Sequence, residues 1–285
     1  MTRLLTPDEP PAVVTLRPEG TSPFLLVSDH AGRRIPHALG DLGVSESERR
    51  RHIAWDVGIE PVVRFMADEL DAHAILQPYS RLVIDCNRPF HAPTSIAPIS
   101  ESTPIPGNVK LTKDEIEARQ REIFLPYHAT IAAELDRREQ AALPAFLVAM
   151  HSFTPVFKGV SRPWHSGVLY NRDSRFAAFV LRLLREEDEM TVGDNEPYMV
   201  TDDTDYTIPV HGEQRGLPHV AIEIRHDLIE TEADQRAWAQ RMCRVLIEAK
   251  RLRDESYGVA DAQPAPDAHR ASCASASDSP VRAVS

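Results

Sequence analysis

The sequence predicts a three-layer α/β/α domain with a mixed, mainly parallel central sheet. Short apolar segments of strand length alternate with segments of helical periodicity, which is the pattern of this fold class. The clearest apolar segment, residues 145–150 (AFLVAM), follows a proline and leads directly into His151. In open α/β sheets ligands bind beyond the carboxyl ends of the strands, so we expect a site near His151.

The remaining elements follow from the same two periodicities. Further strands are expected at residues 24–28, 74–77, 82–85, 165–171 and 220–224. Helices are expected from Ile59, after a capping box of Thr112 and Glu115, from about Asp173, and after Thr231. The second helix should reach about residue 140 and bend at Pro126, because proline lacks the amide hydrogen that a helix interior requires.

Length and composition indicate one domain with short extensions. The chain has 285 residues, of which 42% are hydrophobic, enough for a substantial core. Residues 1–22 are expected to be an extended lead-in, and residues 23–257 the main domain. Residues 258–285 contain too little apolar surface to fold alone and are expected to be disordered.

Charge and cysteine content limit the partners. A formal net charge of −11 argues against a nucleic-acid surface, although a local arginine cluster could still bind a small anion. Three widely spaced cysteines suit a reducing cytoplasm better than a disulfide framework. We expect a cytoplasmic protein without a signal peptide or membrane segment, because no stretch approaches about 20 apolar residues. The oligomeric state stays open.

Three polar residues could form a metal site. His30 and His151 follow or end apolar segments, and Asp56 precedes the helix expected from Ile59. A catalytic zinc ion commonly takes three such ligands and leaves a fourth position for water. The spacing alone is not diagnostic, because Asp56 could instead cap the helix and the histidines could be ordinary loop residues.

Four further residues could act on a substrate near that site. Glu223 lies on the face of its strand opposite to the apolar residues, where a carboxylate could remove a proton from an attacking water. It could equally form a structural ion pair with Arg225. Arg81 and Arg88, with Asn87 between them, could bind a substrate carboxylate, or they could hold acidic loops in place.

Six segments in order resemble the N-formylglutamate amidohydrolase family. They are residues 28–32 (SDHAG), 52–58 (HIAWDVG), 80–89 (SRLVIDCNRP), 150–153 (MHSF), 195–198 (NEPY) and 222–225 (IEIR). The resemblance implies a zinc-exopeptidase-like (phosphorylase/hydrolase-like) fold. It also implies a zinc-dependent hydrolase that acts on carbon–nitrogen bonds other than peptide bonds, with an N-acyl amino acid as substrate.

The resemblance also assigns roles to individual residues. It implies His30, Asp56 and His151 as ligands of one zinc ion and Glu223 as the general base. Substrate contacts are expected from Arg81, Asn87, Arg88, Ser152 and Arg225. We further expect His211, or else Arg215, to stabilise the oxyanion.

Two segments depart from the family pattern. Asp29 stands where the deformylases carry proline before the first histidine, and the acidic residues 200–206 replace a glycine-rich loop. A divergent branch is therefore expected. Two alternative functions stay open: a catalytically silent protein that binds an acidic metabolite, and a zinc amidase that acts on a peptide-like or cell-wall amide.

Overall fold

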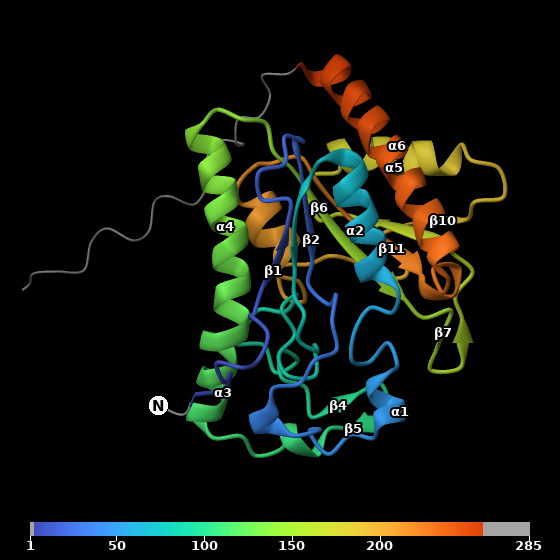
Figure 1. The fold of residues 1–285 in the computed structure, drawn as a ribbon. Helices are drawn as coiled ribbons and strands as arrows, with labels where there is room; N and C mark the ends of the chain where they lie inside the picture. The colour runs from blue at the N-terminus through green and yellow to red at the C-terminus, as the bar shows by residue number, and fades with distance from the viewer. Residues whose placement is uncertain (1–2, 259–285) are drawn as a thin grey trace, which may run out of the picture.

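Seven strands form one central sheet in the computed structural model, which describes residues 3–258 (Figure 1). In spatial order the strands are β1 (Val14–Leu16), β3 (His73–Leu76), β2 (Phe24–Ser28), β6 (Phe146–Phe153), β11 (His219–Arg225), β9 (Ser166–Leu169) and β10 (Val192–Asp194). The β1–β3 and β9–β11 pairs are antiparallel and the other neighbours are parallel. This confirms a mixed, mainly parallel sheet.

Helices cover both faces of the sheet, as Figure 1 shows. On one face lie α2 (Ile59–Leu70), α5 (Arg175–Arg185) and α6 (Glu232–Tyr257), and on the other α3 (Lys113–Arg119) and α4 (Leu125–Gln140). Alternate residues of each central strand point to opposite faces. In β6, for example, Val148 and Met150 pack toward α2 and α6, whereas Leu147 and Ala149 pack toward α4. The predicted three layers are confirmed.

The caps that the sequence predicts are present. Thr112 and Glu115 form the reciprocal capping box at the start of α3, and the Thr231 side chain accepts a hydrogen bond from the Asp234 amide at the start of α6. Between α3 and α4 the helix changes to a π-helical segment (Gln120–Phe124) directly before the turn that contains Pro126. The backbone is helical without a break over residues 113–140, so Pro126 lies within one long helical run, directly after the π-helical turn.

The strand predicted at residues 82–85 is wrong. These residues form a buried turn whose carbonyl groups are bound by side chains: Asn108 Nδ2 donates to the Leu82 carbonyl (2.8 Å) and Arg119 Nη1 to the Val83 carbonyl (2.9 Å). Because side chains satisfy this backbone, the apolar segment is buried without joining the sheet.

The lead-in also contains structure that the sequence did not reveal. Residues 14–16 of this segment form the edge strand β1, which pairs antiparallel with β3. At the other end, the structure describes Gly258 as the C-cap of α6, and the predicted disorder of the tail lies otherwise outside the described residues.

Short elements surround one end of the sheet. Figure 1 places α1 (Glu46–Arg49) there, with the hairpin of β4 (Ile99–Ser100) and β5 (Thr103–Pro104). A second hairpin, of β7 (Val156–Phe157) and β8 (Val160–Ser161), follows β6. Single turns of 3-10 helix occur at His37–Leu39, Pro106–Asn108 and His226–Leu228, and a second π-helical segment at Ile208–Glu213.

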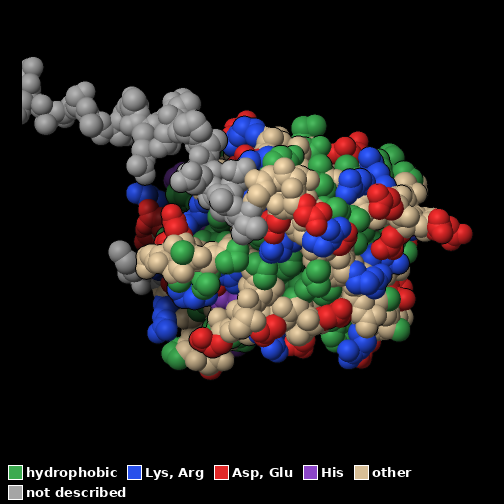
Figure 2. Space-filling model, turned by 90° about the horizontal axis from the view of Figure 1, so that it is seen from above, with side chains coloured by type: hydrophobic (Ala, Val, Ile, Leu, Met, Phe, Trp, Pro, Cys, Tyr) green, Lys and Arg blue, Asp and Glu red, His purple; other side chains and the backbone are tan. Residues whose placement is uncertain are grey.

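The surface charges, the cysteines and the hydropathy of the helices bear on the predicted partners and cellular location. Acidic and basic side chains are interspersed over the face shown in Figure 2. Cys86 and Cys243 are buried and free, and Cys273 lies outside the described residues. Among the described helices, none combines the length and the apolar character that crossing a membrane requires. The absence of a nucleic-acid partner and the cytoplasmic location stay predictions.

Candidate active site and metal centre

His151 and Glu223 lie side by side on the central strands. The two residues are register partners on the parallel strands β6 and β11, and both point toward the α4 face. Ala149 and Ala221 are register partners two residues earlier on the same strands, and both line the same cavity. Because alanine is small, these positions leave space in front of the two polar side chains.

His30 and Asp56 come from loops that are tied to each other. His30 follows the end of β2, and its carbonyl accepts a hydrogen bond from the Asp56 amide (2.9 Å). The carboxylate of Asp56 accepts a hydrogen bond from the Ser152 amide (3.3 Å). The N-cap of α2 is Gly58, in a left-handed conformation at φ 79°, so the alternative role of Asp56 as the helix cap is wrong.

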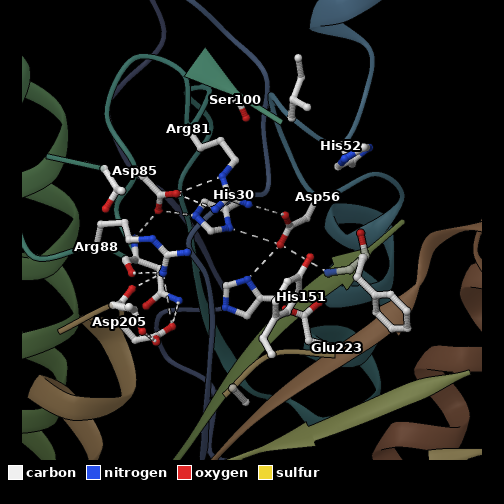
Figure 3. A pocket seen from close by; sticks show the side chains of 18 of the residues that line it. His30, His52, Asp56, Arg81, Asp85, Arg88, Ser100, His151, Asp205 and Glu223 are labelled. Carbon is white, nitrogen blue, oxygen red and sulfur yellow. Dashed lines mark hydrogen bonds and ion pairs between the residues drawn. The ribbon is translucent and has the colours of Figure 1, made fainter. Parts of the chain in front are cut away.

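Three candidate ligand atoms converge at this point. His151 Nδ1 lies 2.9 Å and His30 Nδ1 lies 3.4 Å from Asp56 Oδ2. Ligand atoms of a tetrahedral zinc ion lie about 3.3 Å apart, since the bonds are about 2.0–2.1 Å long. His30 Nδ1 is buried without a hydrogen-bond partner among the described residues. Figure 3 shows the three side chains turned toward one another. The set fits a zinc ion in donor chemistry and spacing.

Two further carboxylates orient the histidines. Asp85 Oδ1 lies 2.7 Å from His30 Nε2, and Asp29 Oδ2 lies 3.2 Å from His151 Nε2. Each carboxylate therefore holds the outer ring nitrogen and leaves Nδ1 facing the centre, as is usual around metal-bound histidines. Asp29 also accepts a hydrogen bond from Thr207 Oγ1 (2.6 Å).

The sequence analysis assigned no individual role to Asp29 or Asp85. A signal for Asp29 existed, because this acidic residue directly precedes His30 and was noted as a departure from the expected family pattern. Burial by itself would raise the pKa of Asp29, but contact with His151 outweighs this effect and lowers the pKa to about 2. Asp29 is therefore ionised at neutral pH and suited to hold an imidazole N–H.

Glu223 has the properties of a proton acceptor. Its side chain is buried, and Oε2 has no hydrogen-bond partner among the described residues. Burial raises the pKa of Glu223 to about 7, whereas the pKa of Asp56 is lowered because the two histidines outweigh its burial. Two neighbouring carboxylates whose pKa values are pushed in opposite directions are typical of acid and base roles.

Arg81 lines the cavity and also supports the site. Its Nε and Nη2 donate to Asp85 Oδ2 (3.0 and 2.6 Å), and its Nη1 lies 3.6 Å from Asp56 Oδ1. Arg81 therefore does hold acidic residues in place, which is the alternative role that the sequence left open. The side chain is still 26% exposed, which leaves it accessible to a ligand in the cavity.

Asn87 and Arg88 also line the cavity, and both fasten the loop on its far side. Asn87 Nδ2 donates to Asp205 Oδ1 (3.1 Å), and Asn87 Oδ1 accepts from the amides of residues 206 and 207. Arg88 donates to the Thr204 carbonyl and lies 3.6 Å from Asp205. In Figure 3, Arg88 and Asp205 accordingly lie together at one side of the centre.

His211 and Arg225 do not line the cavity. The predicted contact of His211 with the oxyanion and that of Arg225 with the substrate therefore fit the structure poorly. His211 stacks on His128, with its Nε2 3.0 Å from His128 Nδ1, and is not among the described residues that line the cavity. Arg225 Nε donates to Asp227 (2.8 Å), and its Nη1 donates to backbone carbonyls of residues 162–164. Because strand residues alternate between faces, Arg225 would be expected on the same face as Glu223. It lies at the end of β11, however, and its side chain binds the partners named above.

Ser152 and Arg215 have structural partners. Ser152 lines the cavity, but its Oγ donates to the Val57 carbonyl (2.8 Å) and thereby fixes the loop that carries Asp56. Arg215, the alternative oxyanion contact, donates to Asp136 (2.6 Å) away from the cavity lining. Neither side chain points a free donor at the centre.

The cavity in front of the centre has a volume of about 560 Å3, within the range of small-molecule sites. The three candidate ligands and Glu223 line its inner end. Its walls include the β4 strand, Phe157 of β7, and residues 198–200, 204, 205, 207 and 208. The proline- and serine-rich segment 91–108 also contributes to this wall, through Thr94, Ala97, Ile99 and Glu101.

Solved structures resemble this fold along most of its length. The crystal structure of a gene product of Agrobacterium tumefaciens is 35% identical, with a TM-score of 0.85, over 88% of this chain and 99% of that one. The N-formylglutamate amidohydrolase of Ralstonia eutropha is 22% identical, with a TM-score of 0.60, over 85% of this chain and 98% of that one. The latter likeness supports the fold.

Sequence relatives point to the same group. The N-formylglutamate deformylases of Pseudomonas putida and Pseudomonas aeruginosa are each 31% identical, over 144 and 143 residues. The alignments cover 47% of this chain and 53% of each relative, so the chain spans about half the length of the curated relatives it matches. The family model for N-formylglutamate amidohydrolase matches residues 22–230, which is more than half of the chain. The chain therefore belongs to the N-formylglutamate amidohydrolase family.

Proposed function

We propose that this protein is a zinc-dependent amidohydrolase that cleaves the amide bond of an N-acyl amino acid, with an N-formyl group as the first candidate acyl group. The observation that carries the proposal is the convergence of two imidazole nitrogens and one carboxylate beside Glu223, whose buried Oε2 has no hydrogen-bond partner within residues 3–258. Family membership and the name of the Pseudomonas relatives support the choice of bond.

His30, Asp56 and His151 would hold the zinc ion. When bound, zinc would supply a Lewis acid that polarises the scissile carbonyl and makes water a better nucleophile. Asp85 and Asp29 keep the two imidazole rings in the orientation that presents Nδ1. The ligands therefore need little rearrangement on binding.

Glu223 performs the proton transfers. Its carboxylate accepts a proton from the attacking water as the new C–O bond forms. It then donates this proton to the amide nitrogen as the C–N bond breaks, which releases the carboxylic acid and the free amino acid. Burial raises the pKa of Glu223, which helps its carboxylate to hold the transferred proton until the nitrogen takes it.

Arg81 would bind the α-carboxylate of the substrate. Its guanidinium is planar, partly exposed in the cavity and fixed at its inner edge by Asp85. A fixed guanidinium offers paired donors in the geometry that a carboxylate requires. This contact would orient the amide bond relative to Glu223.

Metal analysis and a hydrolysis screen test the proposal. The purified protein is analysed for zinc and then incubated with N-formyl, N-acetyl and longer N-acyl amino acids. We expect about one zinc ion per chain and hydrolysis of at least one of these compounds. A protein that binds no zinc would refute the metal site. Zinc binding without turnover would instead favour a catalytically silent binding protein.

A further inference from the structure

The scissile carbonyl oxygen calls for a hydrogen-bond donor from the protein. When water adds to an amide, this oxygen becomes an oxyanion, and a donor fixed beside it stabilises the transition state. The two side chains predicted for this role, His211 and Arg215, are not among the described residues that line the cavity. Ser152 and Thr207 do line it, but their hydroxyl groups donate to other protein groups. The donor must therefore come from another residue of the wall.

Tyr198 stands in the cavity wall beside the strand that carries Glu223. Gly167 on β9 is the register partner of Glu223, and a β-carbon at Gly167 would lie 2.0 Å from the Glu196 carbonyl oxygen. Register partners point to the same face of a sheet, so residue 196 crosses the face that carries Glu223. Tyr198 follows two residues later and lines the cavity together with Glu223. Backbone packing thus brings this tyrosine next to the proposed general base.

A buried arginine holds the Tyr198 hydroxyl. Arg162 is 9% exposed, and its Nη1 donates to Tyr198 Oη (2.9 Å). Its guanidinium also lies over the rings of Tyr198 and Phe157, 4.7 and 4.6 Å from their centroids. Within residues 3–258, these aromatic faces and this hydroxyl meet the positive charge, without an ion pair to a carboxylate. Burying a cation in this way is costly, which indicates a functional reason for it.

The contact with Arg162 leaves the Tyr198 proton available to a second partner. A guanidinium has no acceptor, so the hydroxyl accepts from Arg162 and its own O–H points elsewhere. The pKa of Tyr198 is raised by burial and then by the negative charge of Glu223, although Arg162 and Arg81 oppose the shift. Tyr198 is therefore protonated at neutral pH, and its hydroxyl lies within electrostatic reach of Glu223.

We propose that Tyr198 is a catalytic residue whose hydroxyl donates a hydrogen bond to the scissile carbonyl oxygen, and that Arg162 positions this hydroxyl. This inference rests on the proposed function and adds a residue to its reaction. As the water oxygen bonds to the carbonyl carbon, the π electron pair moves to the carbonyl oxygen and a water proton moves to Glu223. Tyr198 keeps its proton and shares it in the hydrogen bond. When the C=O bond re-forms and the C–N bond breaks, Glu223 gives its proton to the nitrogen.

Tyr198→Phe tests the hydroxyl, because phenylalanine keeps the ring that packs on Arg162. With the N-acyl amino acid that the zinc-loaded protein hydrolyses fastest, we expect kcat to fall about 100-fold, as for the loss of one oxyanion donor, and KM to stay within about threefold. Tyr170→Phe is the matched control, since Tyr170 Oη donates to Asp194 (2.8 Å) and Tyr170 is not among the described residues that line the cavity. An unchanged kcat in Tyr198→Phe, a change in KM alone, or equal losses in both variants would overturn the proposal.

Arg162→Lys tests the positioning role. Lysine keeps the charge but not the planar group, so kcat should fall about 10-fold with KM nearly unchanged. In a Tyr198→Phe background the same substitution should have no further effect on kcat, because Arg162 acts through the hydroxyl. Arg162→Gln takes its place if the lysine variant does not fold. An equal loss of kcat with and without the hydroxyl would show that Arg162 only stabilises the fold, and its positioning role would be wrong.

Binding of a tetrahedral mimic separates this inference from the proposed function. The probe is an H-phosphinic acid analogue of N-formyl-L-glutamate, in which a tetrahedral phosphinate with two oxygens replaces the planar formamide. Calorimetry with the zinc-loaded protein needs no turnover, so it decides the inference even if no compound is hydrolysed and the proposed function fails. Tyr198→Phe should weaken binding of this analogue about 10-fold or more, whereas Tyr170→Phe should not. Equal affinities of the wild type and Tyr198→Phe, or no binding to either, would overturn the inference.

Discussion

Glu223 and His151 are register partners on the parallel strands β11 and β6 and point to the same face of the sheet. A proposed metal ligand and the proposed general base therefore sit on two hydrogen-bonded strands in the middle of the core. Rigid strands hold side chains more accurately than loops, which favours a fixed distance between metal and base.

The first prediction concerns Glu223. Glu223→Gln keeps the size of the side chain but removes its ability to accept a proton, so turnover should fall by roughly 100-fold or more. Zinc content should stay near that of the wild type, because Glu223 is not part of the ligand set. Steady-state kinetics and elemental analysis check the two expectations.

Glu101→Gln is the matched control for this substitution. Glu101 also lines the cavity, directly after β4, but its Oε2 accepts a hydrogen bond from Arg51 Nη2 (2.5 Å). Turnover of this variant should stay within a few-fold of the wild type. If Glu223→Gln loses zinc, Glu223 is a ligand and its role as base falls.

The second prediction concerns the ligands. His30→Ala and His151→Ala should each abolish stoichiometric zinc binding, because two ligands rarely retain zinc in a catalytic site. His52→Ala serves as the control, since His52 lines the same cavity outside the ligand cluster. Equal zinc loss in all three variants would show that the ligands are misidentified.

The third prediction concerns the carboxylates behind the histidines. Asp29→Asn and Asp85→Asn should each weaken zinc binding about 10- to 100-fold, which is the usual cost of losing a group that orients a ligand. Competition with a chelator measures the affinity. Asp205→Asn, which alters a carboxylate bound to Asn87 and not to a histidine, should leave zinc affinity unchanged.

The fourth prediction concerns the substrate carboxylate. Arg81→Lys should lower kcat/KM for an N-acyl amino acid about 10-fold or more, because an ammonium group cannot make a paired contact to a carboxylate. Arg225→Lys is the matched control, since Arg225 binds Asp227 outside the cavity. Similar kinetics of Arg81→Lys and the wild type would remove Arg81 from the binding site.

The fifth prediction concerns pH and stability. Burial lowers the pKa of His128 to about 4 and that of His211 to about 3, against 6.5 for an unperturbed histidine. Between pH 6.5 and 4 the unfolded state therefore binds more protons than the folded state, so the free energy of unfolding should fall as the pH decreases. Each histidine contributes at most about 1.4 kcal/mol per pH unit.

Urea unfolding with EDTA present measures this effect without a contribution from metal release. His211→Gln should reduce the dependence on pH, whereas His37→Gln, at a side chain that is 72% exposed, should not. A wild-type protein whose stability stays constant from pH 6.5 to 4 would contradict the buried, neutral state of the pair.

Several features were predictable because they depend on local sequence. The alternation of apolar segments predicted the layers, and the Thr112 capping box fixed the start of α3. The candidates His30, Asp56 and His151 were recognisable as polar residues beside apolar segments, and the structure brings these three together. Residues 82–85 misled the prediction because their apolar pattern reports burial, and burial is not limited to strands.

By itself, the sequence determined which segments are buried, where helices begin and which polar residues stand at the ends of strands, since these depend on neighbours along the chain. Tertiary structure decided which of those residues meet. Asp29 and Asp85 reach the histidines, whereas His211 and Arg225 bind other partners. The physical reason is that strand order and side-chain direction arise from pairing between residues far apart in the chain, such as His151 with Glu223, and no local pattern encodes that pairing.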